Sequence, residues 1–154
     1  MDSYEPAGGL NSEIESPRIR EYVPEDFSSV TRLWTVSGIH VGPSDTVEEL
    51  ERTRQRDPDL FLVAETHDGV VGVVLGRFDG RRGWIHHLAV DPSHRSHGIG
   101  GLLVRELEKR LSAKGCSKVN LHVLRSNEGV CAFYEALGYS RFDLIFMDKW
   151  LNPP

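Results

Sequence analysis

An arginine followed by three closely spaced glycines is the part of this sequence best suited to binding a ligand. The stretch is Arg95-Ser-His-Gly98-Ile-Gly100-Gly101, and it lies between an apolar segment (84–90) and a long amphipathic one. This order predicts a strand, a tight loop and the start of a helix. The first N–H groups of a helix have no partner within it and carry partial positive charge, so such a loop suits phosphate or pyrophosphate. Glycines let the ligand approach the backbone closely.

The glycine pattern differs from two better-known phosphate loops. No Gly-x-x-x-x-Gly-Lys-Ser/Thr is present, and glycines at 98, 100 and 101 do not follow Gly-x-Gly-x-x-Gly. A nucleotide-binding protein of the P-loop type is therefore disfavoured. Glycines at a helix start can also form a plain loop, so a second pattern is needed to decide between a loop and a site.

The second pattern joins an asparagine and a tyrosine. Asn127 follows a predicted strand (118–124), and Tyr134 comes seven residues later on the same face of the next predicted helix. Taken singly, the two residues are explained by an N-cap asparagine and a core tyrosine.

Together, the two patterns resemble the GCN5-related N-acetyltransferase (GNAT) superfamily. The resemblance covers about residues 18–150, and the motifs follow that family's order. Segments 60–65 and 78–83 also resemble YpeA-type bacterial members. The resemblance implies an acyltransferase that moves an acetyl group from acetyl-CoA to a primary amine. A non-catalytic acyl-CoA-binding or sensing module is the alternative, which the presence of Asn127 and Tyr134 disfavours.

The resemblance also implies which residues hold acetyl-CoA. The Arg95 side chain would lie near its phosphates, and the Asn127 side chain would hydrogen-bond the pantetheine arm. A bulge in strand 84–90, with a splay from strand 118–124, would open the cleft. The backbone of the first strand would pair with the pantetheine arm through Leu88, Ala89 and Val90. The pyrophosphate would be held by the backbone amides of Ser96, His97, Gly98, Ile99, Gly100 and Gly101.

Two residues are candidates for proton transfer. By resemblance, Tyr134 would act as the general acid that protonates the departing CoA thiolate, while an N–H at or beside Leu88 would polarise the thioester carbonyl. Strand alternation places Trp84, His86 and Leu88 on one face, with His87 on the other face beneath a helix. His86 is the candidate general base, because a histidine pKa lies near neutrality. A partly buried structural histidine is the alternative.

Hydrophobic periodicity predicts a mixed α/β fold in the order β-α-α-β-β-β-α-β-α-β. The strand-helix-strand unit around 98–114 predicts one parallel pair. As in the GNAT fold, we expect a mostly antiparallel twisted sheet of six to seven strands, with a splayed parallel pair and about four helices on both faces.

The expected strands are 18–22, 60–66, 70–78, 84–90, 118–124 and 142–150. The expected helices are 24–38, 45–56 (with a capping box at 45–48), 98–114 and 127–137. We expect a flexible leader at 1–17 and one domain at 18–154.

The composition restricts the classes of partner. The 154 residues carry a net charge of −5 without a basic run, so we expect no nucleic-acid partner. No run of about 18 apolar residues is present, so no membrane association is expected. The two cysteines indicate a reduced, cytoplasmic protein, and the seven histidines lack the spacing of a metal site.

No motif identifies the amine acceptor. A small molecule, a peptide, a protein N-terminus and a lysine side chain all stay open. The last predicted strand, 142–150, offers a route to a homodimer through its edge.

Overall fold

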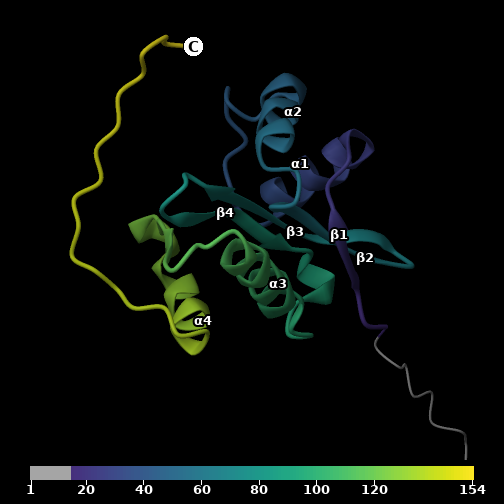
Figure 1. The fold of residues 1–154 in the computed structure, drawn as a ribbon. Helices are drawn as coiled ribbons and strands as arrows, with labels where there is room; N and C mark the ends of the chain where they lie inside the picture. Colours follow the sequence, from purple (N-terminus) through teal and green to yellow (C-terminus); the bar gives the residue numbers. More distant parts are fainter. Residues whose placement is uncertain (1–14) are drawn as a thin grey trace, which may run out of the picture.

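One mixed sheet lies at the centre of the computed structural model, which describes residues 15–154 (Figure 1). Its five strands lie side by side in chain order. The first four pair in antiparallel fashion, and the last is parallel to its neighbour, as the strand-helix-strand unit predicts. The strands are β1 (Arg18–Glu21), β2 (Phe61–Thr66), β3 (Gly69–Phe78), β4 (Gly83–Val90) and β5 (Val119–Leu121).

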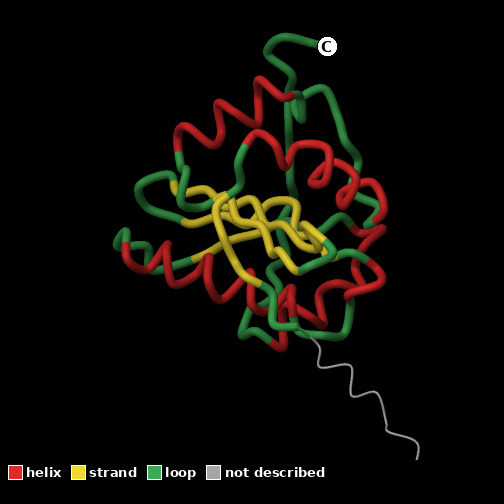
Figure 2. The backbone as a smooth tube through the Cα atoms, turned by 90° about the vertical axis from the view of Figure 1, so that its right-hand side faces the viewer, coloured by secondary structure: helices red, strands yellow, loops and turns green. Residues whose placement is uncertain are grey.

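Helices cover both faces of the sheet, so each face has its own hydrophobic core (Figures 1 and 2). On one face, Trp34 and Leu50 pack against Val73 and other residues of β2 and β3. On the other face, Leu103 and Tyr134 belong to the second core. The helices are α1 (Phe27–Val36) and α2 (Val47–Arg56) on the first face, with α3 (Ile99–Ala113) and α4 (Cys131–Ala136) on the second. Short 3₁₀ turns occupy Pro24–Asp26, Pro92–His94 and Arg125–Val130.

Three glycines let α3 lie unusually close to the sheet. They are Gly72 and Gly76 on β3 and Gly83 on β4, which we call the glycine positions beneath α3. A Cβ atom on Gly76 would lie 2.3 Å from a methyl carbon of Leu107, and one on Gly83 would lie 2.8 Å from a methyl carbon of Leu111. Any larger residue would therefore push the helix away from the strands.

The sheet has five strands rather than the six to seven we expected, because the segment predicted as strand 142–150 pairs with nothing among the described residues. It runs as an extended chain along the outside of the molecule (Figure 1). Its contacts with the region of β5 are a cation–π contact of Lys118 with Phe142 and ring packing of His122 on Phe146, with centroids 4.8 Å apart. The physical reason is that β5 is only three residues long, so it offers few backbone groups to a further strand.

Smaller differences concern element ends. The cap of α2 lies one residue later than expected, since the Thr46 hydroxyl accepts the Glu49 N–H at 3.2 Å. The helix expected at 127–137 is split into a 3₁₀ turn and α4. Most of the leader expected at 1–17 lies outside the described residues. No helix of the described chain combines the length and apolar character needed to cross a bilayer.

A buried ion pair fixes the start of the domain. Asp26 is 7% exposed, and its carboxylate accepts hydrogen bonds from both terminal nitrogens of Arg20, at 2.7 and 2.9 Å, and from the Val23 N–H at 3.0 Å. Arg20 also donates to Glu65 on β2. Burial acts to raise the pKa of Asp26, but the hydrogen bonds from Arg20 and Val23 outweigh it and hold that pKa below its ordinary value.

We expect Asp26→Asn to lower the free energy of unfolding by about 2 kcal/mol at pH 7, since a charge-assisted pair is replaced by weaker hydrogen bonds. The carboxylate stabilises the fold fully above its ordinary pKa of 3.8, and this contribution is lost as pH falls through the lowered pKa of the folded state. Urea unfolding at pH 7 and pH 3 measures both effects, with exposed Glu25→Gln as the control. An equal stability difference at both pH values would contradict the role of the charge.

Candidate active site

Strand β4 contains a bulge near its middle. Two of its residues, His87 and Leu88, lie opposite the single residue Val74 of β3. His87 has a φ of +48°, which is uncommon for a residue other than glycine. The indole N–H of fully buried Trp34 donates to the His87 carbonyl at 3.1 Å, so α1 holds the bulge in place.

The bulge changes which side chains share a face. Leu88 packs against the α3 core, whereas His86 and His87 both lie on the side of α1 and α2. The expectation that His86 shares a face with Leu88, and that His87 faces the opposite side, was wrong, because one extra residue interrupts the alternation. His87 does lie beneath a helix, since its ring meets that of Trp34 edge-on with centroids 4.8 Å apart.

Beyond the bulge, one edge of β4 has no strand beside it. Gly83, Trp84 and Ile85 pair with β5, and the pairing ends there. Among the described residues, no strand lies on this edge of His86–Val90. A backbone edge with unpaired N–H and C=O groups can bind an extended chain in the manner of an added strand. This open edge leads directly to the loop before α3.

The loop before α3 is exposed and leaves several backbone N–H groups without a partner among the described residues. Ser96 and Gly98 both have positive φ, at +66° and +76°, and Gly98 is the N-cap of α3. Among the described residues, no hydrogen bond involves the N–H groups of 96–101, whereas the Leu102 N–H pairs with the Gly98 carbonyl at 3.0 Å. Successive free N–H groups at a helix start form a cradle for an anion.

The loop is anchored at its beginning by Asp91. The Asp91 carboxylate accepts from the Ser93 N–H at 3.0 Å and the Ser93 hydroxyl at 2.6 Å, and Arg32 of α1 lies 3.0 Å away. The hydrogen bonds from Ser93, with further help from Arg32, lower the pKa of Asp91 to about 2. Arg95 donates to the Val90 carbonyl at 3.3 Å and to the Ser37 hydroxyl at 3.4 Å. Its side chain therefore joins the end of β4 to the end of α1, beside the loop.

Tyr134 lies in the core beneath the start of α3. It is 8% exposed and meets the rings of Phe133 and Tyr139 edge-on, with centroids 5.0 and 5.5 Å away. Phe133 in turn lies 3.3 Å from where a Cβ atom of Gly100 would be, so α4 packs beside the cradle. Burial raises the pKa of Tyr134 to about 12, and its hydroxyl makes no hydrogen bond among the described residues.

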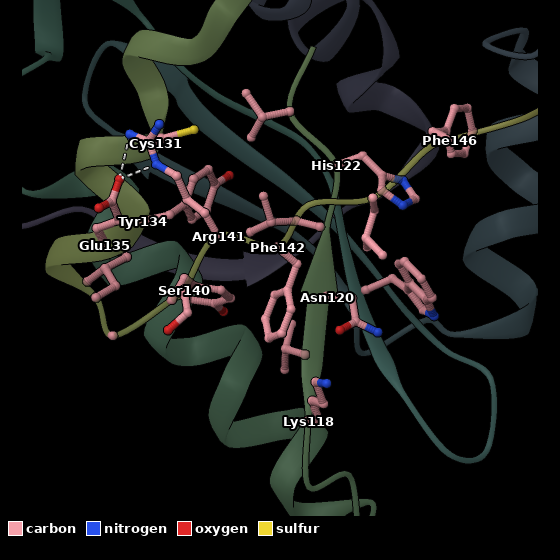
Figure 3. Close-up of a pocket in the computed structure, with 18 of the residues that line it drawn as sticks. Lys118, Asn120, His122, Cys131, Tyr134, Glu135, Ser140, Arg141, Phe142 and Phe146 are labelled. Carbon is pink, nitrogen blue, oxygen red and sulfur yellow. Dashed lines mark hydrogen bonds and ion pairs between the residues drawn. The ribbon is translucent and has the colours of Figure 1, made fainter. Parts of the chain in front are cut away.

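A groove of about 1040 Å³ also reaches Tyr134, between β5, α4 and the chain after α4. In Figure 3, Tyr134 and Cys131 lie on one side of this groove, with Arg141 hydrogen-bonded to Glu135 nearby. The loop before α3 and the open edge of β4 do not line it. The groove is thus bounded by the unpaired C-terminal segment and is separate from the cradle.

Asn127 lies at the strand-to-helix junction, as expected, but not as a helix cap. Its φ and ψ of −117° and 26° interrupt the 3₁₀ turn, and its backbone N–H donates to the Leu124 carbonyl at 2.8 Å. Its side chain is exposed and makes no hydrogen bond within the described chain. The side-chain amide is therefore available to a ligand.

Both histidines of β4 have a pKa below the ordinary histidine value. Burial, followed by the positive charge of Arg77 and the neighbouring His87 and His122, lowers the pKa of His86 to about 4. Burial also lowers the pKa of His87, although Asp45, with its carboxylate 3.6 Å from Nε2, acts in the opposite direction. His86 is therefore a free base over the whole neutral range.

The structure adds residues that the sequence patterns did not single out. A cavity of about 330 Å³ lies next to His86, at the point where β4 and β5 separate. Its two arginines come from different elements, Arg56 from the end of α2 and Arg77 from β3. Arg77 could have been noticed, because it continues the alternation of Val73 and Leu75, which face the α1 core. Arg77 itself is exposed, so its side chain extends past the core that Val73 and Leu75 help to form.

A bulged strand with an open edge, an anion cradle at a helix start and a buried tyrosine beside it together form a site of the kind that an extended, phosphate-bearing ligand would fit.

The sequence matches the Acetyltransferase (GNAT) family over residues 23–139, and the chain belongs to this family. It is 41% identical over 133 residues to an acetyltransferase of Pectobacterium atrosepticum, covering 86% of this chain and 94% of the relative. An acetyltransferase of Yersinia pseudotuberculosis is 39% identical with the same coverage. The protein is therefore an acyltransferase.

Solved structures share the fold. Ard1 from Thermoplasma volcanium has a TM-score of 0.75 at 25% identity, covering 84% of this chain and 86% of its own. The PaiA N-acetyltransferase from Thermoplasma acidophilum, solved with coenzyme A, has a TM-score of 0.73 at 23% identity, with 85% and 94% covered.

Proposed function

We propose that this acyltransferase moves an acetyl group from acetyl-CoA to a primary amine, and that the amine attacks the thioester directly. The observation that carries this proposal is the position of the open edge of β4. It connects the anion cradle at one end with His86 at the other. An extended donor bound along this edge would have its phosphates at the cradle and its reactive end beside a neutral base. The relative solved with coenzyme A supports the choice of donor.

In this proposal the backbone holds most of the donor. The free N–H groups of 96–101 bind the pyrophosphate, and the Arg95 guanidinium lies close enough to turn toward it. The unpaired edge at Leu88, Ala89 and Val90 hydrogen-bonds the pantetheine arm. The exposed amide of Asn127 binds the same arm from the opposite side of the splay.

The chemistry then needs three further contributions. The Leu88 N–H, or that of its neighbour in the bulge, donates to the thioester oxygen as negative charge develops there. His86 takes the proton from the attacking amine. As the carbon–sulfur bond breaks, Tyr134 gives its proton to the leaving thiolate, so that CoA departs as the neutral thiol.

The pH dependence of the reaction tests His86. If His86 is the base, kcat/KM of the wild type, expressed per unprotonated amine, should fall at low pH with an apparent pKa near 4 rather than near 6.5, because the folded imidazole stays neutral down to that pH. We expect His86→Gln to lower kcat/KM about 100-fold and to remove this acid limb. His67→Gln, an exposed histidine in the β2–β3 turn, is the control. An acid limb that persists in His86→Gln places the base elsewhere.

Thiol release from acetyl-CoA across amines, amino acids and peptides tests the function itself. Release that depends on an acceptor supports acetyl transfer. Binding of acetyl-CoA without release on any acceptor supports the alternative, a non-catalytic acyl-CoA-binding or sensing module.

A further inference from the structure

We propose that the amine acceptor is a small molecule that carries an anionic group, a carboxylate or a phosphate, and that Arg77 and Arg56 bind this group in the cavity beside His86. The inference rests on the proposed function and adds the chemical class of the acceptor. It assigns a role to two arginines that the donor site does not use.

The position of the cavity favours the acceptor rather than the donor. It opens where the paired part of β4 and β5 ends, on the face of α1 and α2, whereas the cradle belongs to α3. His86 lies in its wall, so an amine in this cavity would reach the proposed base directly. The cavity is lined by Arg56, Arg77, Phe78, Asp79, Trp84, His86 and His122.

Arg77 is free to bind an anion. Its guanidinium donates to the Thr53 hydroxyl at 3.2 Å, and no carboxylate lies within ion-pair distance of it among the described residues. Arg77 and His86 both line the cavity, and the positive charge of Arg77 contributes to the lowered pKa of His86. A guanidinium has donors left over after one hydrogen bond to a hydroxyl, and these match the oxygens of a carboxylate or phosphate.

Arg56 approaches the same space from α2. It donates to the Phe78 carbonyl at 3.1 Å and lies 3.5 Å from the Asp57 carboxylate, so its charge is partly balanced. These contacts leave part of the guanidinium exposed toward the cavity. Arg56 is therefore the second, weaker contact of the proposed anion site.

Asp79, the acidic residue in the cavity wall, forms no ion pair with Arg56 or Arg77 among the described residues. Asp79 accepts from the N–H groups of Arg81 and Arg82 at 2.8 and 2.7 Å, and from the Trp84 indole N–H at 3.2 Å. The hydrogen bonds from the two backbone N–H groups, the largest contributions, lower the pKa of Asp79 to about 2. Its carboxylate thus shapes the turn between β3 and β4.

The walls of the cavity suit a small acceptor. The cavity is largely open to solvent, and its volume of about 330 Å³ can hold a short chain and an anionic group. The rings of Trp84 and His122 lie 5.4 Å apart at its side and offer an apolar surface to a short carbon chain. An acceptor with a short carbon chain between its amine and its anionic group would place the amine at His86 and the anionic group at Arg77.

Matched acceptor pairs test the inference. We would compare β-alanine with β-alaninamide, and phosphoethanolamine with ethanolamine, with rates expressed per unprotonated amine. The wild type should show a kcat/KM about 10- to 100-fold higher for at least one anionic member than for its neutral partner. Arg77→Gln should remove that preference, mainly through KM, and Arg77→Lys should keep part of it. Arg81→Gln, in the exposed turn outside the cavity, should retain it. The two pairs separate a carboxylate from a phosphate acceptor.

Binding of the acetylated product gives a second measurement that does not need turnover. N-acetyl-β-alanine should shift the imidazole NMR signals of His86 and His122 in a saturable way, and its amide should not; Arg77→Gln should abolish the shift.

Equal transfer to charged and neutral acceptors, or transfer confined to peptides, would overturn the inference and leave acetyl transfer intact. Absence of thiol release on every acceptor would instead overturn the proposed function. Failure of both acetylated products, N-acetyl-β-alanine and N-acetylphosphoethanolamine, to shift either histidine signal would overturn the anion site independently.

Discussion

Replacing Tyr134 with phenylalanine should lower kcat by about 10²–10⁴-fold and leave the affinity for acetyl-CoA nearly unchanged. The ring contributes to the core through its edge-on contacts with Phe133 and Tyr139, and phenylalanine keeps these contacts. What the variant loses is one hydroxyl, which makes no hydrogen bond among the described residues. The loss therefore falls on the step that needs its proton.

The raised pKa of Tyr134 has two consequences for this step. With a pKa of about 12, the phenol keeps its proton through the whole neutral and mildly alkaline range, so the acid form is always present. It is also a weaker acid than an ordinary thiol of pKa near 8.5, by about 3–4 pKa units or roughly 5 kcal/mol. The same apolar surroundings raise the pKa of a thiol bound there, which narrows this gap. The hydroxyl thus acts by donating to sulfur as charge develops on it.

Rapid-quench or steady-state thiol release, together with direct binding of acetyl-CoA, measures the effect of Tyr134→Phe. Tyr139→Phe is a matched control: it removes a hydroxyl that donates to Glu108 at 2.7 Å in the same core. The control should keep wild-type kcat while losing some stability. A Tyr134→Phe variant with wild-type kcat would rule out the role of general acid.

Gly76→Ala should lower the free energy of unfolding by about 2–3 kcal/mol, although it adds a single methyl group. The new Cβ atom would lie 2.3 Å from one methyl carbon of Leu107 and 2.9 Å from the backbone oxygen of Leu60. Leu107 is fully buried and cannot turn toward solvent, so α3 must move away from the sheet. For a chain of this length the melting temperature should fall by about 5–10 °C.

Two variants isolate the cause of that loss. Gly42→Ala places its Cβ atom no closer than 3.6 Å to a neighbour, an ordinary contact, and should be nearly neutral. Leu107→Ala is destabilising by itself, since it leaves a cavity. Combined with Gly76→Ala, it should cost less than the sum of the two single changes, because the clash with the Leu107 side chain disappears and only the contact with the Leu60 oxygen stays. Strictly additive effects in urea unfolding would mean that α3 and β3 are not in contact here.

The sequence predicted the parts of the molecule that depend on local pattern. Apolar periodicity located the five strands of the sheet and four helical regions, and the glycines located the start of α3. The family follows from the two short motifs, and the sequence match confirms it. The YpeA-type subgroup, the cytoplasmic location and the homodimer stay predictions.

The parts that the sequence missed depend on long-range pairing. The bulge expected in strand 84–90 by resemblance is confirmed, but nothing local to His86-His87-Leu88 gives its position, since Trp34 holds it from 53 residues away in the chain. Alternation counted without the bulge therefore placed His87 and Leu88 on the wrong faces. The apolar run after Ser140 has the composition of a strand, yet a strand also needs a partner edge, and β5 is too short to supply one. The cavity beside His86 brings together residues from α2, β3, β4 and the chain after β5, which no single motif contains.

Because α3 packs closely on the sheet and also forms the cradle, a ligand bound at the cradle should stabilise the folded protein. The same helix covers the glycine positions beneath it and provides the free N–H groups of the cradle at its first turn, where Ile99 is buried. An anion held by those groups binds the folded chain and not the unfolded one, so it must raise the melting temperature. For a ligand at about one hundred times its dissociation constant the gain is about 2.7 kcal/mol. Saturating acetyl-CoA should therefore restore much of the stability that Gly76→Ala removes, and a thermal scan would report how fully the coenzyme occupies the protein.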